Sequence, residues 1–95
     1  MAVKIIILRR VTPEKEPELR PLLLQMRALA HAQNGYISGE TLINYDDPSE
    51  RVVISSWKTL ENWNDWLNNP QRIALQDQVD QLLGSETLYQ IYYNG

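Results

Sequence analysis

The 95-residue sequence predicts one α+β domain, residues 1–95, in which helices cover one face of a four-stranded antiparallel sheet. Three observations lead to this prediction. The length is at the low end for a domain, and half of it would be too short to hold a core. Apolar residues make up 43% of the chain and charged residues 22%, which is typical of a folded globular protein. Four strand-like runs alternate with two helical stretches along the chain.

The first strand and the first helix are predicted from residue type and spacing. Residues 3–11 are rich in β-branched side chains and carry apolar groups on both faces of a strand. Thr12 is predicted to cap the following helix, with proline in the first turn. From Leu19 onward the apolar residues have the spacing of one helix face. Pro21 argues against a clean start, and Gly35 is predicted to end the helix in a left-handed conformation.

The remaining elements follow from turn and cap residues. Thr59 and the Asn69-Pro70 pair are predicted to start two consecutive helical segments. Strands are expected over residues 36–45, 51–57 and 86–93, and helices over residues 60–68 and 70–84. The resulting order of strand, helix, strand, strand, helix, strand is the ferredoxin-like βαββαβ arrangement, which leaves one face of the sheet open.

The open face of this predicted sheet carries more apolar surface than a solvated face should. Ile5 and Ile6 in the first strand, and Val52 and Val53 in the third, place aliphatic groups on both faces. Several such groups exposed together mark an interface. We therefore expect a homodimer formed sheet to sheet through the open face, the alternative being a monomer with a modestly hydrophobic sheet.

Composition and charge exclude several classes of function. The chain has no cysteine and only one histidine, His31, so no thiolate or histidine-rich metal site is expected. The net charge of −3 argues against a nucleic-acid-binding surface, and the strands lack the central aromatic residues of RNA-recognition modules. The longest apolar run, residues 5–8, is too short to span a bilayer, and the N-terminus lacks a secretory pattern. We expect a soluble cytoplasmic protein.

Two segments resemble the antibiotic biosynthesis monooxygenase family. Residues 34–42, Asn-Gly-Tyr-Ile-Ser-Gly-Glu-Thr-Leu, resemble its Gly-Tyr strand, and residues 56–67 resemble its strand-end Trp that runs into a helix with a further Trp. The resemblance implies a dimeric α+β barrel with a pocket between sheet and helices in each unit. It also implies cofactor-independent oxygenation of an electron-rich quinol or polyphenol-like substrate.

Asn62 and Trp66 are the candidate catalytic residues. They lie four residues apart and so share one helix face. They match the Asn and Trp with which family monooxygenases contact substrate, which implies a hydrogen bond from Asn62 to a phenolate or peroxide and stacking by Trp66. The alternatives are that Asn62 helps to cap its helix and that Trp66 belongs to the core.

Other polar and aromatic side chains are candidates for substrate binding. Arg9 and Arg72 could pair with a phenolate or carboxylate, although most arginines are simply solvated. Arg9 and Arg10 point to opposite faces of the strand, and the sequence does not show which faces the helices. Trp63 and Tyr89 complete the predicted substrate-binding set, Tyr89 alternatively belonging to an interface.

Glu40 and His31 have alternative assignments. A buried Glu40 could act as a base, and an exposed one would form a salt bridge. His31 is expected to be solvated near the end of the first helix. Haem-degrading enzymes of this fold use a histidine ligand in the second helical region, and residues 73–77 contain none. We therefore expect no cofactor, and retain as alternative function a non-catalytic homodimeric ligand-binding or stress-associated module.

Overall fold

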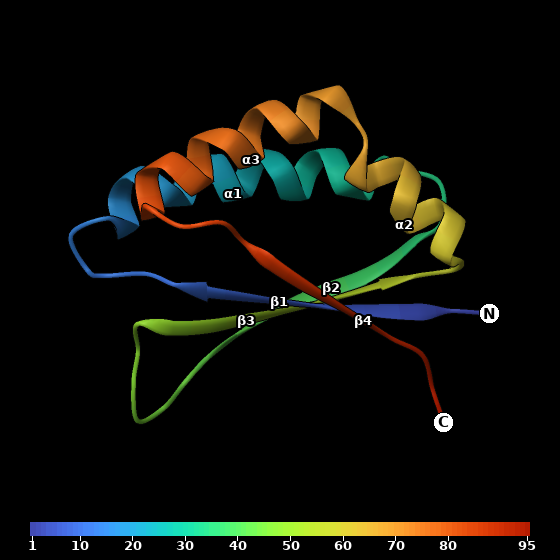
Figure 1. Cartoon of the computed structure of the whole chain (residues 1–95), viewed down its shortest axis with the longest axis horizontal. Helices are drawn as coiled ribbons and strands as arrows, with labels where there is room; N and C mark the ends of the chain where they lie inside the picture. Colours follow the sequence, from blue (N-terminus) through green and yellow to red (C-terminus); the bar gives the residue numbers. More distant parts are fainter.

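The sheet has the strand order β2-β3-β1-β4, and all neighbouring strands are antiparallel (Figure 1). The computed structural model describes residues 1–95. The strands are β1 (Val3–Arg10), β2 (Tyr36–Ile43), β3 (Glu50–Trp57) and β4 (Leu88–Tyr92). The helices are α1 (Glu16–His31), α2 (Leu60–Leu67) and α3 (Pro70–Leu83). This confirms the predicted ferredoxin-like α+β fold, with the second helical region divided in two.

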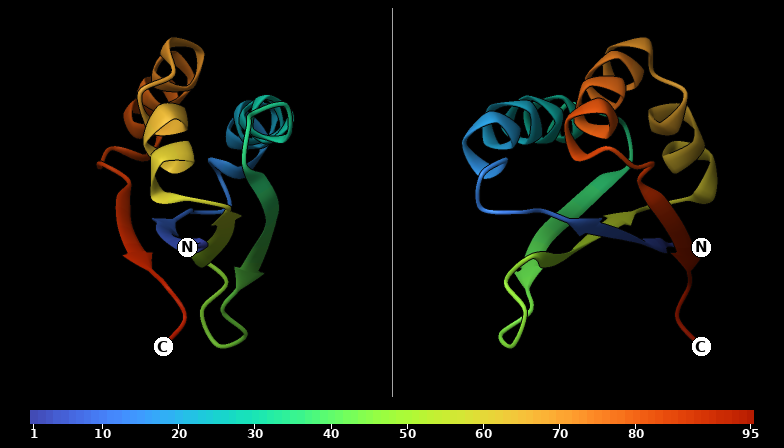
Figure 2. Two further views of the ribbon diagram at one scale, coloured as in Figure 1. Left: turned by 90° about the vertical axis from the view of Figure 1, so that its right-hand side faces the viewer. Right: turned by 60° about the vertical axis from the view of Figure 1, so that its left-hand side comes forward.

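All three helices lie on the same side of the sheet (Figure 1). Figure 2 shows that α1 lies over the β2 side, whereas α2 and α3 lie over the β4 side. The opposite face of the sheet is left uncovered within the chain (Figure 2). No helix is both long enough and apolar enough to cross a membrane.

The strand β1 buries its apolar residues on the helix-facing side and exposes apolar residues on the other. Val3, Ile5 and Ile7 are buried against the helices, whereas Leu8 is exposed on the open face and Ile6 is half-buried there. Each fully buried aliphatic side chain contributes about 1.5–3 kcal/mol to folding. The apolar run at the centre of β1 thus serves both faces, as its pattern predicted.

The core consists of two clusters side by side under the helices. One is largely aromatic and joins Trp57, Trp63 and Trp66 to the residues of β1. The other is aliphatic and joins Leu19 of α1 to Val79 of α3. Because no phenylalanine is present, the large rings of the core all carry a polar atom.

The start of α1 differs from the prediction. Lys15, not Thr12, precedes the helix, and no side chain caps it. Thr12 instead opens a turn, in which its carbonyl accepts a hydrogen bond from the Lys15 N–H at 3.1 Å. A helix starting at Thr12 would hold two prolines in its interior, Pro17 and Pro21, each without a backbone N–H to donate. Starting at Glu16 puts Pro17 in the first turn, where no N–H is required, and leaves Pro21 as the one proline inside the helix.

The predicted caps of the later helices are confirmed. The Thr59 side chain accepts a hydrogen bond from the Asn62 N–H at 3.0 Å and caps α2. Asn69 caps α3 by accepting from the backbone N–H groups of Gln71 and Arg72. Gly35 has the predicted positive φ of 80°, but α1 is capped at Ala32, so Gly35 leads into β2 rather than closing the helix.

Two predicted strands are shorter than expected because side chains start turns beside them. The side chain of Asn44 accepts hydrogen bonds from the N–H groups of Asp46 and Asp47, which ends β2 at Ile43. Asp80 accepts from both the backbone N–H and the hydroxyl of Thr87, so β4 begins only at the next residue.

Candidate functional site

A cavity of about 220 Å³ lies between the sheet and the helices. Every strand and every helix contributes to its wall, since the sheet and helix layers meet there. The six predicted site residues divide into five that line the cavity and one that does not. The five are Arg9, Trp63, Trp66, Arg72 and Tyr89.

The aromatic end of the cavity is a set of rings in contact. Trp57 stacks on Trp66 at 6.3 Å between ring centroids and meets Trp63 edge-on at 6.0 Å. Trp63 also contacts Tyr89 at 5.5 Å. The indole N–H of Trp57 donates to the Ser55 hydroxyl at 2.7 Å, whereas those of Trp63 and Trp66 make no hydrogen bond within the chain. This wall can stack against a flat ring and offers indole donors to it.

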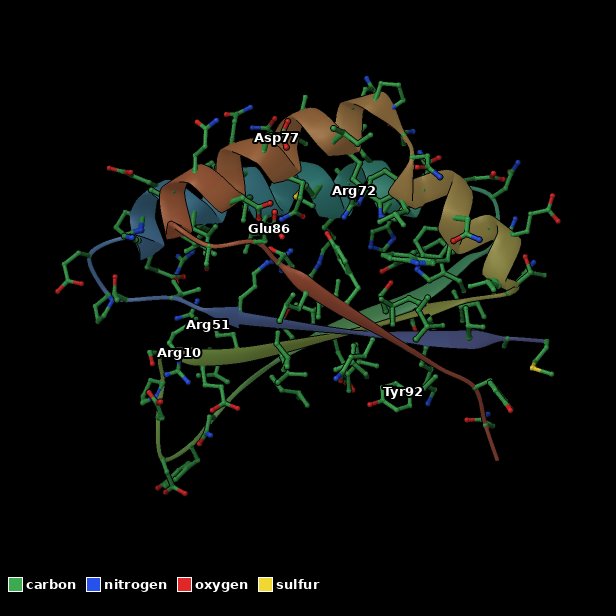
Figure 3. The ribbon with its side chains drawn as sticks, in the orientation of Figure 1. Arg10, Arg51, Arg72, Asp77, Glu86 and Tyr92 are labelled. Carbon is green, nitrogen blue, oxygen red and sulfur yellow. The ribbon has the colours of Figure 1, made fainter.

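Arg72 is buried between α3 and the sheet (Figure 3). Its guanidinium donates to the Leu67 carbonyl at 3.1 Å and to the Tyr89 hydroxyl, and it lies 5.2 Å from the Tyr89 ring centroid. The Tyr89 hydroxyl in turn donates to Gln76 at 3.1 Å, and Gln76 donates to Asp80 at 2.8 Å. A continuous polar chain therefore runs from the cavity toward Asp80.

The phenol of Tyr89 is held in its neutral form. Burial raises the pKa of Tyr89, and the nearby guanidinium groups of Arg72 and Arg9 offset this effect only in part. At neutral pH the Tyr89 hydroxyl is consequently a hydrogen-bond donor rather than an anion.

Arg9 faces the helices and lines the cavity, which answers the question that the sequence left open. Arg10 points the other way and pairs with Asp47 at 2.9 Å. The Nε of Arg9 is buried and has no hydrogen-bond partner. Burial lowers the pKa of Arg9. The charge of Arg72 lowers this pKa further, whereas Tyr89 raises it in part. A guanidinium nevertheless stays protonated at neutral pH, so Arg9 is an unpaired cation in the wall.

A cluster of charged side chains joins the start of α1 to β3. Glu16 accepts hydrogen bonds from Arg20 at 3.0 Å and from Arg51. Burial would raise the pKa of Glu16, but the hydrogen bonds from Arg20 and Arg51 outweigh it and hold that pKa below its ordinary value. Arg51 was not predicted as a site residue, although its alternation with Val53 and Ser55 places it on their face of the strand.

Asn62 does not line the cavity. Its side-chain oxygen accepts a hydrogen bond from the Thr59 hydroxyl at 2.8 Å, and its backbone N–H donates back to that hydroxyl. The alternative of a capping role is thus realised in the structure. Glu40 is exposed on the open face of the sheet, away from the cavity, and forms no salt bridge. His31 is exposed, with its ring 4.7 Å from that of Tyr36.

A second hollow lies on the other side of the polar chain. Arg72, Gln76 and Tyr89 line both hollows, so these three side chains form the partition between them. Asp77 and Glu86, shown in Figure 3, line only the second. Nowhere in the chain do three His, Asp or Glu side chains come together as a possible metal site.

A match to a family model identifies the family of this chain. The model named "Antibiotic biosynthesis monooxygenase" matches residues 2–78. The chain belongs to that family. The search of curated proteins found no match.

Solved structures share the fold across almost the whole chain. A conserved protein from Methanosarcina mazei Go1 superimposes with a TM-score of 0.91 at 18% identity, covering 100% of this chain and 94% of that one. Rv0793 from Mycobacterium tuberculosis gives 0.86 at 20% identity, with coverages of 100% and 96%. A variant of SnoaB, a cofactor-independent oxygenase from Streptomyces nogalater, gives 0.83 at 16% identity, with coverages of 98% and 92%. At these identities the likeness concerns the fold alone.

Proposed function

We propose that this family member is a cofactor-independent monooxygenase whose cavity binds an electron-rich aromatic substrate of the quinol or polyphenol class. The observation that carries the proposal is the cavity wall, which combines two indole rings without internal hydrogen bonds with an unpaired guanidinium. Family membership and the shared fold of SnoaB support the same reaction class.

The proposed reaction uses the substrate itself as the reductant of dioxygen. A phenol loses its proton, and the phenolate gives an electron to O₂. The two radicals combine at a ring carbon to form a peroxide. Loss of water from the peroxide leaves a quinone, so one oxygen atom enters the ring and the other leaves in water. Phenol plus O₂ thus gives quinone plus water, and no external reductant is needed.

The chain's own residues are assigned to binding, to charge stabilisation and to exclusion of water. Trp63 and Trp66 stack on the ring, and the indole N–H of Trp66 donates to the phenolate or peroxide oxygen. Arg72 and Arg9 stabilise negative charge on the bound substrate, because a preorganised cation in a site with little water acts more strongly than one in solvent. Tyr89, a neutral phenol, holds Arg72 in place.

The experiment is oxygen uptake by the purified chain with a panel of naphthols, anthrones and quinols. Uptake above the autoxidation rate, with one O₂ consumed per quinone formed and no hydrogen peroxide released, is the expected result. The Trp66→Phe variant is expected to lose about tenfold or more of the rate, since removal of one donor to a developing oxyanion can cost 10²–10³. Uptake at the background rate with every substrate would overturn the enzyme assignment.

Asn62 is the residue on which the two functional hypotheses differ. Its predicted catalytic role requires its side chain to leave the Thr59 hydroxyl and reach the substrate. The capping contact instead favours the second candidate, a non-catalytic ligand-binding module with the same cavity. If Asn62→Ala leaves the oxygen-uptake rate unchanged while Trp66→Phe lowers it, Asn62 is a structural residue of an active enzyme.

We also propose that two chains pack through the open face of the sheet into the dimeric α+β barrel. Supporting this, Leu8, Leu42, Leu88 and Tyr92 are exposed on that face, beside the half-buried Ile6. Figure 3 shows Tyr92 on the side of the sheet away from the helices. An apolar patch of this kind on one sheet is self-complementary under two-fold symmetry. The cytoplasmic location expected from the sequence stays a prediction.

A further inference from the structure

Arg9 and Arg51 are direct partners across the β1–β3 ladder. Both line the cavity. Directly opposed like charges destabilise a sheet, so this pair has a cost in the unliganded protein. The Nε atoms of both side chains are buried and have no hydrogen-bond partner. Two guanidinium donors in the wall of the cavity are therefore left unsatisfied.

The charged residues around the cavity are strongly unbalanced. Five arginines line it, and Glu16 is its only lining carboxylate; the arginines are Arg9, Arg20, Arg27, Arg51 and Arg72. Glu16 is already shared between Arg20 and Arg51. Arg72 bonds only to uncharged oxygens, and Arg9 makes no side-chain hydrogen bond or salt bridge. The wall thus lacks an anion beside Arg9.

We propose that Arg9 and Arg51 form a binding site for a carboxylate of the substrate, so that the substrates of this protein are aromatic carboxylates. This inference rests on the proposed function, because it concerns the same cavity and the same aromatic ligand. A carboxylate has two oxygens in one plane, and planar guanidinium donors match such a group better than they match the single oxygen of a phenolate. The carboxylate end of the ligand lies at the arginine pair, and the ring lies toward Trp63 and Trp66.

The site also has a thermodynamic signature. A buried charge without a partner destabilises the folded chain, and its replacement by an apolar side chain of similar size removes that penalty. Arg9→Met is therefore expected to melt at the same temperature as the unchanged chain or above it, while it binds the anionic ligand more weakly. An arginine that served only to hold the fold together would show the opposite behaviour in the melting experiment.

The test is isothermal titration without oxygen, using 1-hydroxy-2-naphthoate and 1-naphthol, which differ only in the carboxylate. The unchanged chain is expected to bind the naphthoate more tightly by roughly 10- to 100-fold, the effect of hydrogen bonds to a charged group. Arg9→Met should lose most of this preference and keep its affinity for 1-naphthol. The matched control is Arg10→Gln, one residue along the same strand but facing away from the cavity, which should behave as the unchanged chain.

Equal affinity of the unchanged chain for the two ligands would overturn the proposal, as would an equal loss of both affinities in Arg9→Met. Should Arg9→Met fail to fold, the unchanged chain still gives an answer, since equal affinities for the naphthoate and the naphthol would by themselves overturn the proposal. Binding is measured without oxygen, so it is independent of turnover. If the chain prefers the carboxylate but takes up no oxygen, the carboxylate site is supported and the enzyme assignment is wrong. If it takes up oxygen without that preference, the enzyme assignment is supported and the carboxylate site is wrong.

Discussion

The side-chain amide of Asn62 occupies the space next to Gly35, so that a Cβ added to Gly35 would overlap with the Oδ1 of Asn62. Gly35 precedes β2, and Asn62 lies in the first turn of α2. The contact therefore joins the loop after α1 to the start of α2. It also explains why Asn62 points away from the cavity, since its oxygen is held between Gly35 and the Thr59 hydroxyl.

The first prediction compares two glycines with similar backbone angles. Gly35→Ala and Gly84→Ala both force an L side chain to a positive φ, 80° and 72° respectively, which costs about 1–2 kcal/mol each. Only the Gly35 position is also occupied by another side chain, whereas nothing lies within 4 Å of a Cβ at Gly84. Urea unfolding should show a clearly larger loss of stability for Gly35→Ala. Equal losses would contradict the packing role of Asn62.

The second prediction concerns the acid stability contributed by Glu16. Its pKa in the folded chain lies below the ordinary value of 4.5, so its contribution is present above pH 4.5 and is lost as the pH falls through the folded-state pKa. Glu16→Gln should therefore be less stable than the unchanged chain at neutral pH and equally stable in strong acid. The control is Glu18→Gln in the same turn, whose carboxylate forms no salt bridge. If the difference in stability between Glu16→Gln and the unchanged chain stays constant down to low pH, the lowered pKa of Glu16 is wrong.

The third prediction concerns the hydroxyl of Tyr89. Tyr89→Phe leaves Arg72 and the Gln76 carbonyl oxygen each short of one partner, which should cost about 1–3 kcal/mol in thermal or urea unfolding. The control is Tyr45→Phe, because Tyr45 is 97% exposed and should tolerate the change without effect. No difference between the two variants would show that the polar chain contributes nothing to stability.

The raised pKa of Tyr89 gives the fourth prediction, at alkaline pH. The folded chain favours the neutral phenol, so the stabilisation is fully present below the ordinary pKa of 10 and is lost as the pH rises through the folded-state value. The difference in stability between the unchanged chain and Tyr89→Phe should shrink above pH 10. Ultraviolet difference spectra should show one tyrosine that ionises after the others and is missing from Tyr89→Phe.

The fifth prediction tests the proposed dimer. Leu8→Asp places a charge on the open face at a residue 41% exposed in the single chain, and Ile73→Asp places one on α3 at a residue 43% exposed. If the open face is an interface, Leu8→Asp should sediment as a monomer, because an unpaired charge would otherwise be buried. Ile73→Asp should keep the mass of the unchanged chain. If Leu8→Asp sediments with the same mass as the unchanged chain, the open face is not the dimer interface.

The parts of the structure that the sequence predicted are those decided by local chemistry. Asn69-Pro70 divides the second helical region because an Asn cap and a Pro in the first turn act within a few residues. The same local reasoning was wrong at Thr12, because the helix starts later, at Glu16, so that Pro17 lies in its first turn. Gly35 was predicted to close α1, but that helix is capped at Ala32, and Gly35 instead lies where Asn62 of α2 leaves no room for a Cβ.

The candidate site was predicted less completely, since it depends on contacts between distant residues. Trp66 was predicted from the resemblance of residues 56–67 to the family, and Tyr89 from the polar atom that a tyrosine can bring to a pocket. The direction of Arg9 could not be predicted, because both faces of β1 are apolar at its centre. Arg51 was overlooked because its importance comes from the register that sets it opposite Arg9, and register is not visible in one strand alone.

The partition made by Arg72, Gln76 and Tyr89 ties the size of the cavity to a set of hydrogen bonds. In most cavities an aliphatic side chain can be shortened to make room for a longer ligand at the cost of some packing. Here, shortening any of the three side chains would enlarge the cavity toward the second hollow. It would also leave a donor or an acceptor of a neighbouring side chain without a hydrogen-bond partner. The extent of the cavity at this end is thus set by polar groups, so enlarging it calls for coordinated replacement of all three residues rather than of one alone.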